Sequence, residues 1–284
     1  MWVSIDGVRT EPAQATLSVF DRGFLFGDAI YEVVSTCGRR PYQLGPHLDR
    51  LTASGDAIGL DVRPLRADLE DEVGALVAEA GLGERELYIR IMVTAGPCAD
   101  FDLSAGGPPV RIVMVKPLAP WNPRLYAEGI RLLAVRPDEV VGRVAPSVKS
   151  NNRQANVMAY RHARAQGYDD ALFVDPDGLV SEGPTWNVFC VRDGRVATPR
   201  LGRGILPGIT RSTVLRLCAT LGVPATEDEL RLDEARACDE MFVTSTTRGV
   251  MAVAQLDERR FDPTPGPVTR RLSDALAEEM AAAG

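Results

Sequence analysis

The sequence predicts a two-domain protein that combines helices and strands, of the α+β or α/β class. Its 284 residues are enough for two hydrophobic cores of ordinary size. Stretches rich in β-branched residues, such as 86–96 and 110–118, alternate with amphipathic stretches, such as 65–80, whose apolar residues recur at helical spacing. The segment KPLAPWNPR interrupts this pattern with three prolines and no periodicity, which is typical of a linker.

This linker divides the chain into a small N-terminal α/β domain over residues 1–117, the linker itself over 118–125, and a larger C-terminal domain over 126–284. In the first domain we expect a hairpin, a strand, two helices and two further strands. They fall, in order, at 2–9 with its turn at Asp6-Gly7, at IYEVV, from about Pro46 to Gly59, at 65–80 with Gly81 as its stop, at 86–96 and at 110–118.

The C-terminal domain begins with the strand-like run GIRLLAVRP. We expect next a helix closed by Gly167, a meander of strands with Asp-Gly turns, and a helix for which Thr210 is the N-cap. A strand that runs into a hydroxyl-rich turn, EMFVTSTTRGV, and a final amphipathic helix, VTRRLSDALAEEMAAA, complete the domain.

Charge and composition exclude several classes of function. A net charge of -7 and a pI near 5.1 disfavour nucleic acid and anionic membrane surfaces as partners. The N-terminus MWVSIDGVRT has no secretory leader and no apolar run approaches the ~20 residues of a membrane span, so we expect a cytoplasmic protein. Two histidines and five scattered cysteines predict no metal site, no disulfide and no Ser/His/Asp triad.

One lysine is unusual by its rarity. Only Lys116 and Lys149 accompany 30 arginines. Lysine can lose its proton when it is desolvated and can then form a Schiff base with a carbonyl, which arginine cannot do. Rarity alone leaves open that both lysines are ordinary surface residues. Lys149 nevertheless becomes a candidate nucleophile.

Besides the lysine, a Schiff-base enzyme that uses a pyridine cofactor needs a carboxylate for the pyridine nitrogen, a phosphate site and an anchor for the substrate carboxylate. Glu182, directly after a strand, is a candidate partner for the pyridine nitrogen, although an exposed turn acid is the alternative. The helix start at Gly208, Ile209 and Thr210 is a candidate phosphate site, or simply a capped helix. Further candidates for phosphate contacts are Arg50, Ser245, Thr246 and Thr247.

Taken in order along the chain, these segments resemble the class IV aminotransferases, the family that includes branched-chain aminotransferases, D-amino acid transaminases and aminodeoxychorismate lyases. The resemblance runs from about Val3 to Val253. It is carried by FLFGDAIYEVV with HLDRL, YIR, VKSNN, VSEGPTWNVF, LPGITR and FVTSTT. It implies the fold type IV architecture of pyridoxal-phosphate enzymes, in which the larger, cofactor-binding C-terminal domain has a mixed sheet or barrel-like core.

The resemblance also implies roles for individual residues. Lys149 would form the Schiff base with pyridoxal 5'-phosphate and shuttle the substrate proton, and Glu182 would pair with the pyridine nitrogen. The expected phosphate contacts are Arg50, Ile209, Thr210 and Thr246, with Ser245 beside them. At the position where many relatives carry a tyrosine that bonds the cofactor hydroxyl, this chain has Gln154.

Substrate signals in the N-terminal domain disagree. Tyr88 and Arg90 resemble the pair that branched-chain aminotransferases place around substrate carboxylates, although a strand with one polar face would look the same. FGDAIYEVV with Tyr31 looks more like D-amino acid transaminases, yet TAGPCADFDL lacks their carboxylate-binding arginine and histidine. Thr247 is a further candidate substrate contact.

These signals lead to one expected activity, with alternatives left open. We expect transfer of the amino group of a branched-chain or other hydrophobic L-amino acid to 2-oxoglutarate. The alternatives are a D-amino acid or (R)-amine transaminase, a 4-amino-4-deoxychorismate lyase, and a cofactor-free binding module. The resemblance implies a homodimer, for which Phe24, Leu25 and Phe26 are interface candidates if they do not belong to the core.

Overall fold

The computed structural model describes residues 1–80, 85–98, 107–136 and 148–284. The chain forms two compact units. Unit 1 comprises Met1–Ala119, Val148–Asn152 and Met280–Gly284, and unit 2 comprises Arg153–Glu279 and the described part of Pro120–Ser147. The short segment that carries Lys149 therefore packs with the N-terminal unit, although the sequence places it in the domain over 126–284.

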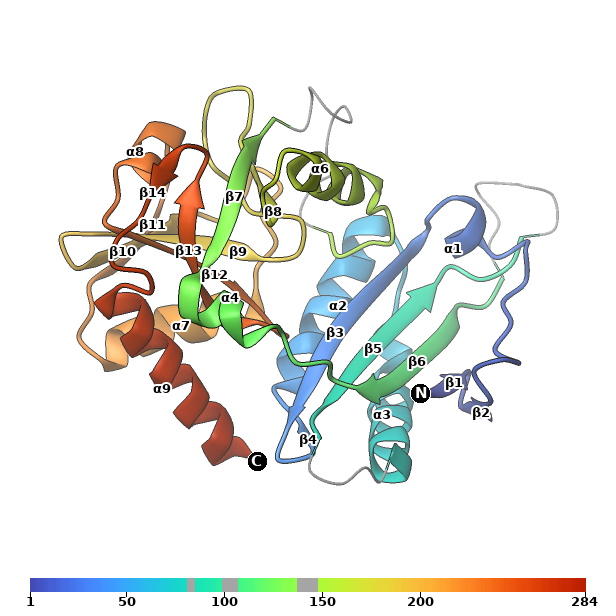
Figure 1. Cartoon of the computed structure of the whole chain (residues 1–284). Helices are drawn as coiled ribbons and strands as arrows, with labels where there is room; N and C mark the ends of the chain where they lie inside the picture. Colours follow the sequence, from blue (N-terminus) through green and yellow to red (C-terminus); the bar gives the residue numbers. More distant parts are fainter. Residues whose placement is uncertain (81–84, 99–106, 137–147) are drawn as a thin grey trace. The chain divides into compact units, whose positions relative to one another are not determined.

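Unit 1 is built on an antiparallel sheet of six strands (Figure 1). The hairpin at its edge turns through Asp6 and Gly7, both at positive φ, as predicted. The strand order is β2 (Val8–Thr10), β1 (Trp2–Ile5), β6 (Val110–Pro117), β5 (Leu87–Thr94), β3 (Ala29–Cys37) and β4 (Arg40–Pro41).

One face of this sheet is the core of unit 1. The predicted helices are α2 (Leu44–Ile58), which ends at Gly59 in the left-handed conformation, and α3 (Arg66–Ala80), which follows the short η1 (Arg63–Leu65). Both pack apolar residues against alternate residues of β5, so the opposite face of that strand keeps its polar side chains. The predicted stop at Gly81 lies outside the described residues.

Unit 2 contains a mixed sheet of eight strands. Its order is β11 (Ala225–Asp228), β10 (Arg195–Pro199), β9 (Asn187–Arg192), β12 (Glu240–Ser245), β13 (Gly249–Leu256), β7 (Ile130–Val135) and β8 (Asp170–Phe173), with β14 (Arg259–Arg260) paired to β13. The predicted Asp-Gly turn at 177–178 is present, since Val174 bridges Val180 and the Phe173 N–H donates to the Glu182 carbonyl. β8 also pairs in parallel with β7 at the edge of the sheet, a neighbour that the predicted meander does not include.

The helices of unit 2 are α4 (Pro123–Glu128), α6 (Gln154–Ala165), α7 (Ile209–Thr220), α8 (Leu232–Arg236) and α9 (Pro267–Ala283). α4 begins inside the predicted linker because Asn122 caps it by accepting from the Arg124 backbone N–H, with a proline at the first helical position. The predicted N-cap of α7 is also wrong. Gly208 is the cap, since its carbonyl already accepts from the Ser212 N–H.

Several expectations about composition can be compared with the described residues. All five cysteines are free thiols, and four of them are buried. Within the described ranges, no group of three His, Cys, Asp or Glu side chains is placed to hold a metal ion. The helices found in those same ranges include none that combines the length and apolar character needed to cross a membrane.

Candidate functional site

Lys149 lies at the edge of the unit 1 sheet, beside the first half of β3. Its carbonyl accepts from the Tyr31 N–H at 2.9 Å, and the next residues form a bridge to Ile30 and a hydrogen bond to Ala29. The Lys149 Nζ is 4.9 Å from the centre of the Tyr31 ring. This short antiparallel pairing holds the backbone of Lys149 against β3.

A buried carboxylate, Glu32, is the next residue of β3. It has no exposed surface and accepts from Arg50 Nε and Nη2, each at 2.7 Å, and it lies 2.7 Å from His47 Nδ1. His47 and Arg50 are three residues apart on α2, so they project from one side of that helix. One edge of the Arg50 guanidinium is thus held by Glu32, which orients the whole group.

Electrostatics within this cluster keep Glu32 ionised. Burial alone raises its pKa, but hydrogen bonds from Arg50 and His47, together with the charges of Arg50 and Lys149, lower the pKa of Glu32 to about 2. The pKa of His47 is lowered by burial, which outweighs its bond to Glu32, and the charges of Arg50 and Lys149 act in the same direction. A fixed negative charge therefore lies close to the lysine amine.

Polar side chains on the other face of the sheet include Tyr31, Tyr88 and Arg90. The Arg90 guanidinium stacks on Tyr31, with its central carbon 4.0 Å from the ring centre, and Arg90 Nη2 donates to Asn151 Oδ1 at 3.5 Å. The Tyr88 ring instead contacts Lys116, and the Lys116 amine is 5.0 Å from the centre of that ring. The structure thus brings Arg90 and Tyr31 to Lys149 within one unit.

In unit 2, Glu182 is held by donors on neighbouring segments. Its Oε2 accepts from Asn187 Nδ2 and from the Leu206 N–H, both at 3.0 Å, and Asn187 also donates to the Leu206 carbonyl. Two donors on one oxygen fix the direction of the Glu182 carboxyl group. Asn187 therefore joins Glu182 to the segment that leads into α7.

The start of α7 carries Ile209 and Thr210, both half-exposed. Its N-cap residue, Gly208, has no side chain to bond the first-turn N–H groups, and those groups together with the helix dipole suit an anion. A Cβ added to Gly208 would come within 2.0 Å of Asn187 Oδ1, so only glycine allows this close approach to the residue that holds Glu182.

The remaining predicted residues of unit 2 lie at two places. Ser245 ends β12, next to the Thr244–Asn187 pair of the sheet register, and Thr246 and Thr247 follow in the turn to β13. The register thus places this hydroxyl-rich turn beside the Glu182 segment. Gln154 is the first residue of α6 and is exposed.

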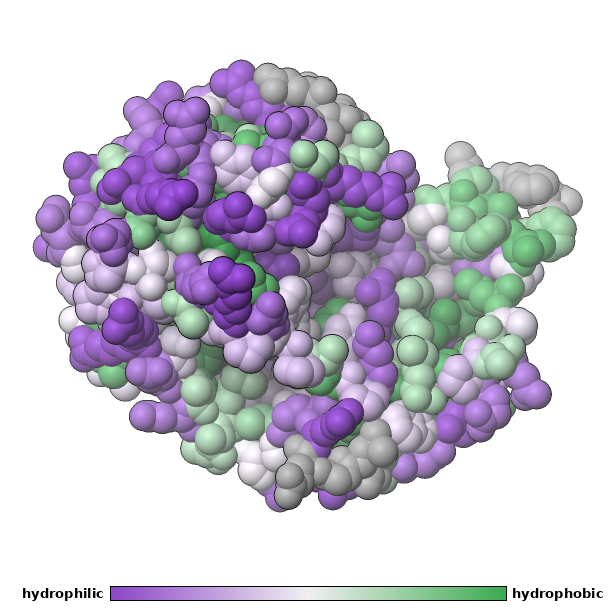
Figure 2. Space-filling model, in the orientation of Figure 1, coloured by the Kyte–Doolittle hydropathy of each residue, from purple (hydrophilic) through white to green (hydrophobic). Residues whose placement is uncertain are grey.

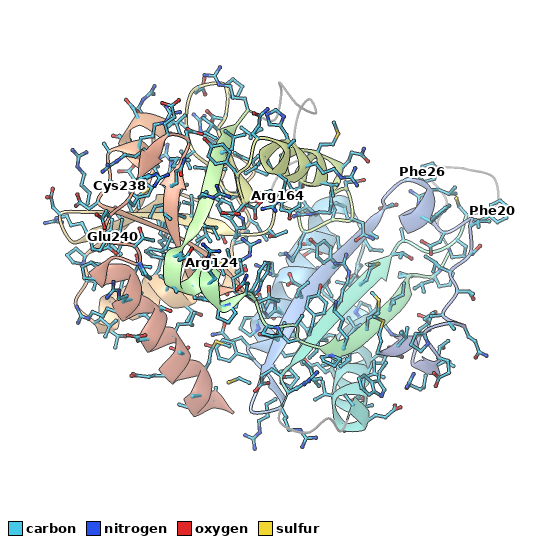
Figure 3. The ribbon with its side chains drawn as sticks, in the orientation of Figure 1. Phe20, Phe26, Arg124, Arg164, Cys238 and Glu240 are labelled. Atoms are coloured by element: carbon cyan, nitrogen blue, oxygen red, sulfur yellow. The ribbon has the colours of Figure 1, made fainter. Side chains whose placement is uncertain are left out.

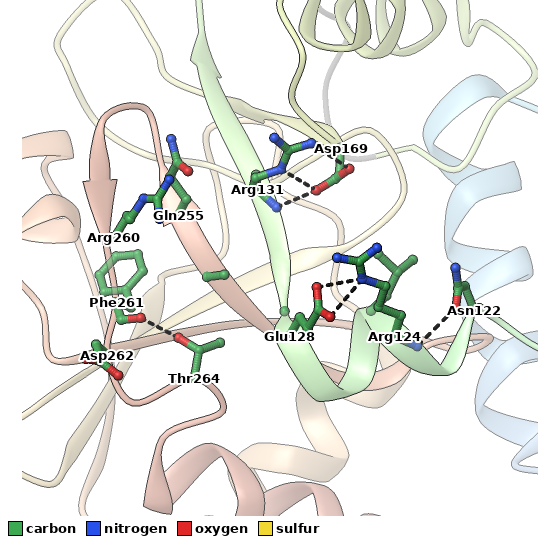
Figure 4. Close-up of a pocket in the computed structure, with 13 residues that line it drawn as sticks. Asn122, Arg124, Glu128, Arg131, Asp169, Gln255, Arg260, Phe261, Asp262 and Thr264 are labelled. Atoms are coloured by element: carbon green, nitrogen blue, oxygen red, sulfur yellow. Dashed lines mark hydrogen bonds and ion pairs between the residues drawn. The ribbon is translucent and has the colours of Figure 1, made fainter.

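A polar cavity of about 820 Å³ also opens on unit 2, between α4, β7 and the β13–β14 region (Figure 4). Arg124 pairs with Glu128 and Arg131 pairs with Asp169 in its wall. None of its lining residues is among the predicted site residues, and internal ion pairs occupy these two arginines. We therefore do not place the candidate functional site in this cavity.

Apolar side chains are exposed around α1 (Arg22–Leu25), in the region of Phe20 and Phe26 (Figures 2 and 3). Phe24 is 68% exposed, and no residue of α1 is buried. The alternative that Phe24 and Phe26 belong to the core of unit 1 is therefore wrong.

Sequence reasoning missed Glu32, His47 and Asn187. The first two had a weak signal: an acid inside an apolar strand, and a histidine three residues before an arginine on a predicted helix. Asn187, a polar residue at the start of the apolar run VFCV, was a comparable signal. Each needs the tertiary structure before its partner is known.

The comparisons with known proteins agree with one another. A family model described as amino-transferase class IV matches residues 29–256. The chain is 31% identical over 283 residues to a protein of Methanocaldococcus jannaschii provisionally named branched-chain-amino-acid aminotransferase, covering 98% of this chain and 96% of the relative. It is 30% identical over 281 residues to a D-alanine aminotransferase of Bacillus licheniformis, covering 99% and 97%.

A solved structure is also similar over nearly the whole chain. It is the branched-chain aminotransferase of the thermophilic archaeon Thermoproteus uzoniensis, crystallised with norvaline. The TM-score is 0.89 at 28% identity, and the alignment covers 99% of this chain and 95% of that one.

Proposed function

This chain belongs to the class IV aminotransferases, and from that premise we propose that it is a pyridoxal-5'-phosphate-dependent transaminase that transfers the amino group of a hydrophobic, branched-chain-type L-amino acid to 2-oxoglutarate. The predicted family, enzyme class and fold type are confirmed by the family match and the shared fold. A cofactor-free binding module is not retained.

The residues present fit the cofactor. Pyridoxal phosphate supplies an aldehyde that bonds an amine and a pyridine ring that withdraws electrons. Lys149 is the amine, and it would also carry the proton to and from the substrate carbon. Glu182, whose direction Asn187 and Leu206 fix, would hold the proton on the ring nitrogen.

The proposed phosphate contacts are those that the family resemblance implies. In unit 2 the first turn of α7, with Ile209 and Thr210, and the hydroxyls of the turn with Ser245 and Thr246 would supply neutral donors. In unit 1 Arg50 would supply the positive charge. Glu32 orients that charge, because it binds the Nε and Nη2 atoms of the guanidinium.

Substrate recognition rests on the cluster around Lys149, which is the observation that carries the proposal. Arg90 lies over Tyr31, and Tyr31 also lies next to the lysine amine. A carboxylate bound by the Arg90 guanidinium would thereby be close to the reacting amine. Tyr88 and Thr247 remain proposed substrate contacts. Gln154 remains a proposed contact of the cofactor hydroxyl.

A D-amino acid transaminase is the second candidate, because the D-alanine aminotransferase of B. licheniformis is almost as similar as the branched-chain relative. Against this candidate, the segment TAGPCADFDL lacks the carboxylate-binding arginine and histidine that the resemblance to D-amino acid transaminases would require. Its residues 99–103 lie outside the described ranges.

A half-reaction screen tests the proposed substrate. The cofactor-loaded protein is mixed separately with L-amino acids, D-amino acids and primary amines, and conversion to the pyridoxamine form is followed by absorbance. Reaction with L-leucine or L-valine but not with D-alanine supports the proposal, whereas reaction with D-alanine and D-glutamate alone supports the second candidate. Pyruvate release from 4-amino-4-deoxychorismate without this conversion would indicate a lyase.

A homodimer formed through the apolar surface around α1 is part of the same proposal. Val19, Phe20 and Phe24 are 63%, 46% and 68% exposed, and burying such a surface against a second copy removes it from water.

A further inference from the structure

A buried carboxylate that the proposed chemistry does not use, Asp170, joins two segments of unit 2. Its Oδ2 accepts from the indole Nε1 of Trp186 at 2.8 Å and from Arg248 Nη2 at 3.0 Å. Asp170 and Trp186 are each 3% exposed, and the Arg248 side chain is 9% exposed. Charge-assisted bonds to a single buried oxygen hold both donors at fixed positions.

Each donor leads to a different part of the proposed cofactor site. Trp186 directly precedes Asn187, whose amide binds Glu182. Arg248 ends the turn that carries Ser245, Thr246 and Thr247. Asp170 is therefore linked on one side to the proposed partner of the ring nitrogen and on the other to a proposed phosphate contact.

The Ser245–Thr247 turn is also held by hydrogen bonds from Trp121 and from Tyr126 of α4. Trp121 Nε1 donates to the Thr247 carbonyl at 3.0 Å, and the Tyr126 hydroxyl donates to the Arg248 carbonyl at 2.9 Å. The Arg248 guanidinium also stacks on Trp121, 4.5 Å from its ring centre. These contacts engage the carbonyls of Thr247 and Arg248 and the Arg248 side chain.

We propose that Asp170 and Arg248 are positioning residues that set the separation between the Glu182 segment and the Ser245–Thr247 turn, so that one cofactor is held at its ring nitrogen and its phosphate together. This inference rests on the proposed function. Neither residue touches the cofactor in this role. A binding site must hold the residues that contact the ligand to within about 0.5 Å of their working positions, and other residues that bond to these must fix them there. Asp170 and Arg248 would have that function.

The test compares pyridoxal 5'-phosphate with pyridoxal, which lacks the phosphate. Both ligands carry the same aldehyde for Lys149, and the measured ratio is the dissociation constant of pyridoxal divided by that of pyridoxal 5'-phosphate. Free pyridoxal also closes to an internal hemiacetal, but that offset is the same for every variant, so a change in the ratio between variants reports the contribution of the phosphate. Both constants are measured on cofactor-stripped full-length protein by tryptophan fluorescence. The variants are Arg248→Met, Asp170→Asn and Arg248→Lys, with Asp169→Asn as matched control, since its carboxylate pairs instead with the half-exposed Arg131.

We expect Arg248→Met to reduce the ratio on the order of 10- to 100-fold, the range for one lost charge-assisted contact, while pyridoxal affinity stays nearly unchanged. Arg248→Lys should restore part of the ratio and Asp169→Asn should leave it as in the wild type. A purely structural role would lower the melting temperature, or weaken both ligands alike, without changing the ratio.

Two other outcomes have separate meanings. If the wild type binds neither ligand, the proposed function fails. If the wild type shows a phosphate contribution that Arg248→Met retains, or that Asp169→Asn removes equally, the positioning inference is overturned and the proposed function stands. Should Arg248→Met fail to fold, the near-isosteric Asp170→Asn decides by the same ratio.

Discussion

Replacing Glu32 with glutamine should destabilise the protein by about 3 kcal/mol at neutral pH. The change keeps the shape of the side chain but removes the negative charge of Glu32, which Arg50 and His47 both contact. Breaking a buried ion pair at one partner is costly because the other charge stays buried without compensation. The Arg50 guanidinium would be the group left in that state.

The magnitude follows from the pKa of Glu32. It is about 2 in the folded protein against an ordinary value of 4.5, because the contacts of Arg50, His47 and Lys149 outweigh the effect of burial. The difference corresponds to about 3 kcal/mol of stability. Since the folded pKa is the lower one, this contribution is fully present above pH 4.5 and is lost as the pH falls toward 2.

Urea unfolding followed by circular dichroism measures the effect. Wild type and Glu32→Gln are compared at about pH 7 and about pH 3, where the wild-type advantage should shrink to about half. Glu79→Gln is the matched control in the same unit, because Glu79 pairs with Arg9 at the surface and its loss should leave the unfolding curve unchanged. A loss below about 1 kcal/mol, or an advantage that does not shrink in acid, would refute the reasoning.

Three further predictions concern the site and the surface. Glu182→Gln should lower kcat on the order of 100-fold or more, because an amide cannot hold the ring-nitrogen proton; an unchanged kcat would remove Glu182 from that role. Arg90→Met should raise the KM for the amino acid roughly 10- to 100-fold with a smaller change in kcat, and steady-state kinetics that show an unaltered KM would exclude a carboxylate contact. Phe24→Asp should shift the protein from dimer to monomer in light scattering, whereas Val8→Asp, at a similarly exposed residue of unit 1, should not.

Much of the fold follows from local patterns in the sequence. The alternation in β5 and the glycine after α2 define their elements without tertiary information, because period and turn chemistry act over a few residues. The place of β8 in the sheet could not be predicted, since its apolar run would suit several buried positions. The N-cap of α7 was misplaced by two residues because the Gly208 carbonyl, and not a hydroxyl, begins the helical bonding.

Some residues of the candidate site could likewise be identified from the sequence, and others could not. Lys149 could be identified because the chain uses arginine almost everywhere else, and Glu182 could be identified through the resemblance. The Glu32 triad and the Asp170 link depend on which segments meet in space, and neither spacing nor composition encodes that. Arg50 was predicted as a phosphate contact, whereas its bond to Glu32 becomes visible only when β3 and α2 are packed together.

The most direct measurement is borohydride reduction of the protein loaded with pyridoxal phosphate, followed by digestion and mass spectrometry. The chain provides its own comparison, because Lys116 is the other lysine and its amine lies over Tyr88. A reduced phosphopyridoxyl adduct on Lys149 and none on Lys116 is the predicted result. An adduct on Lys116 alone, or no adduct on either lysine, would contradict the assignment of Lys149 as the reacting amine.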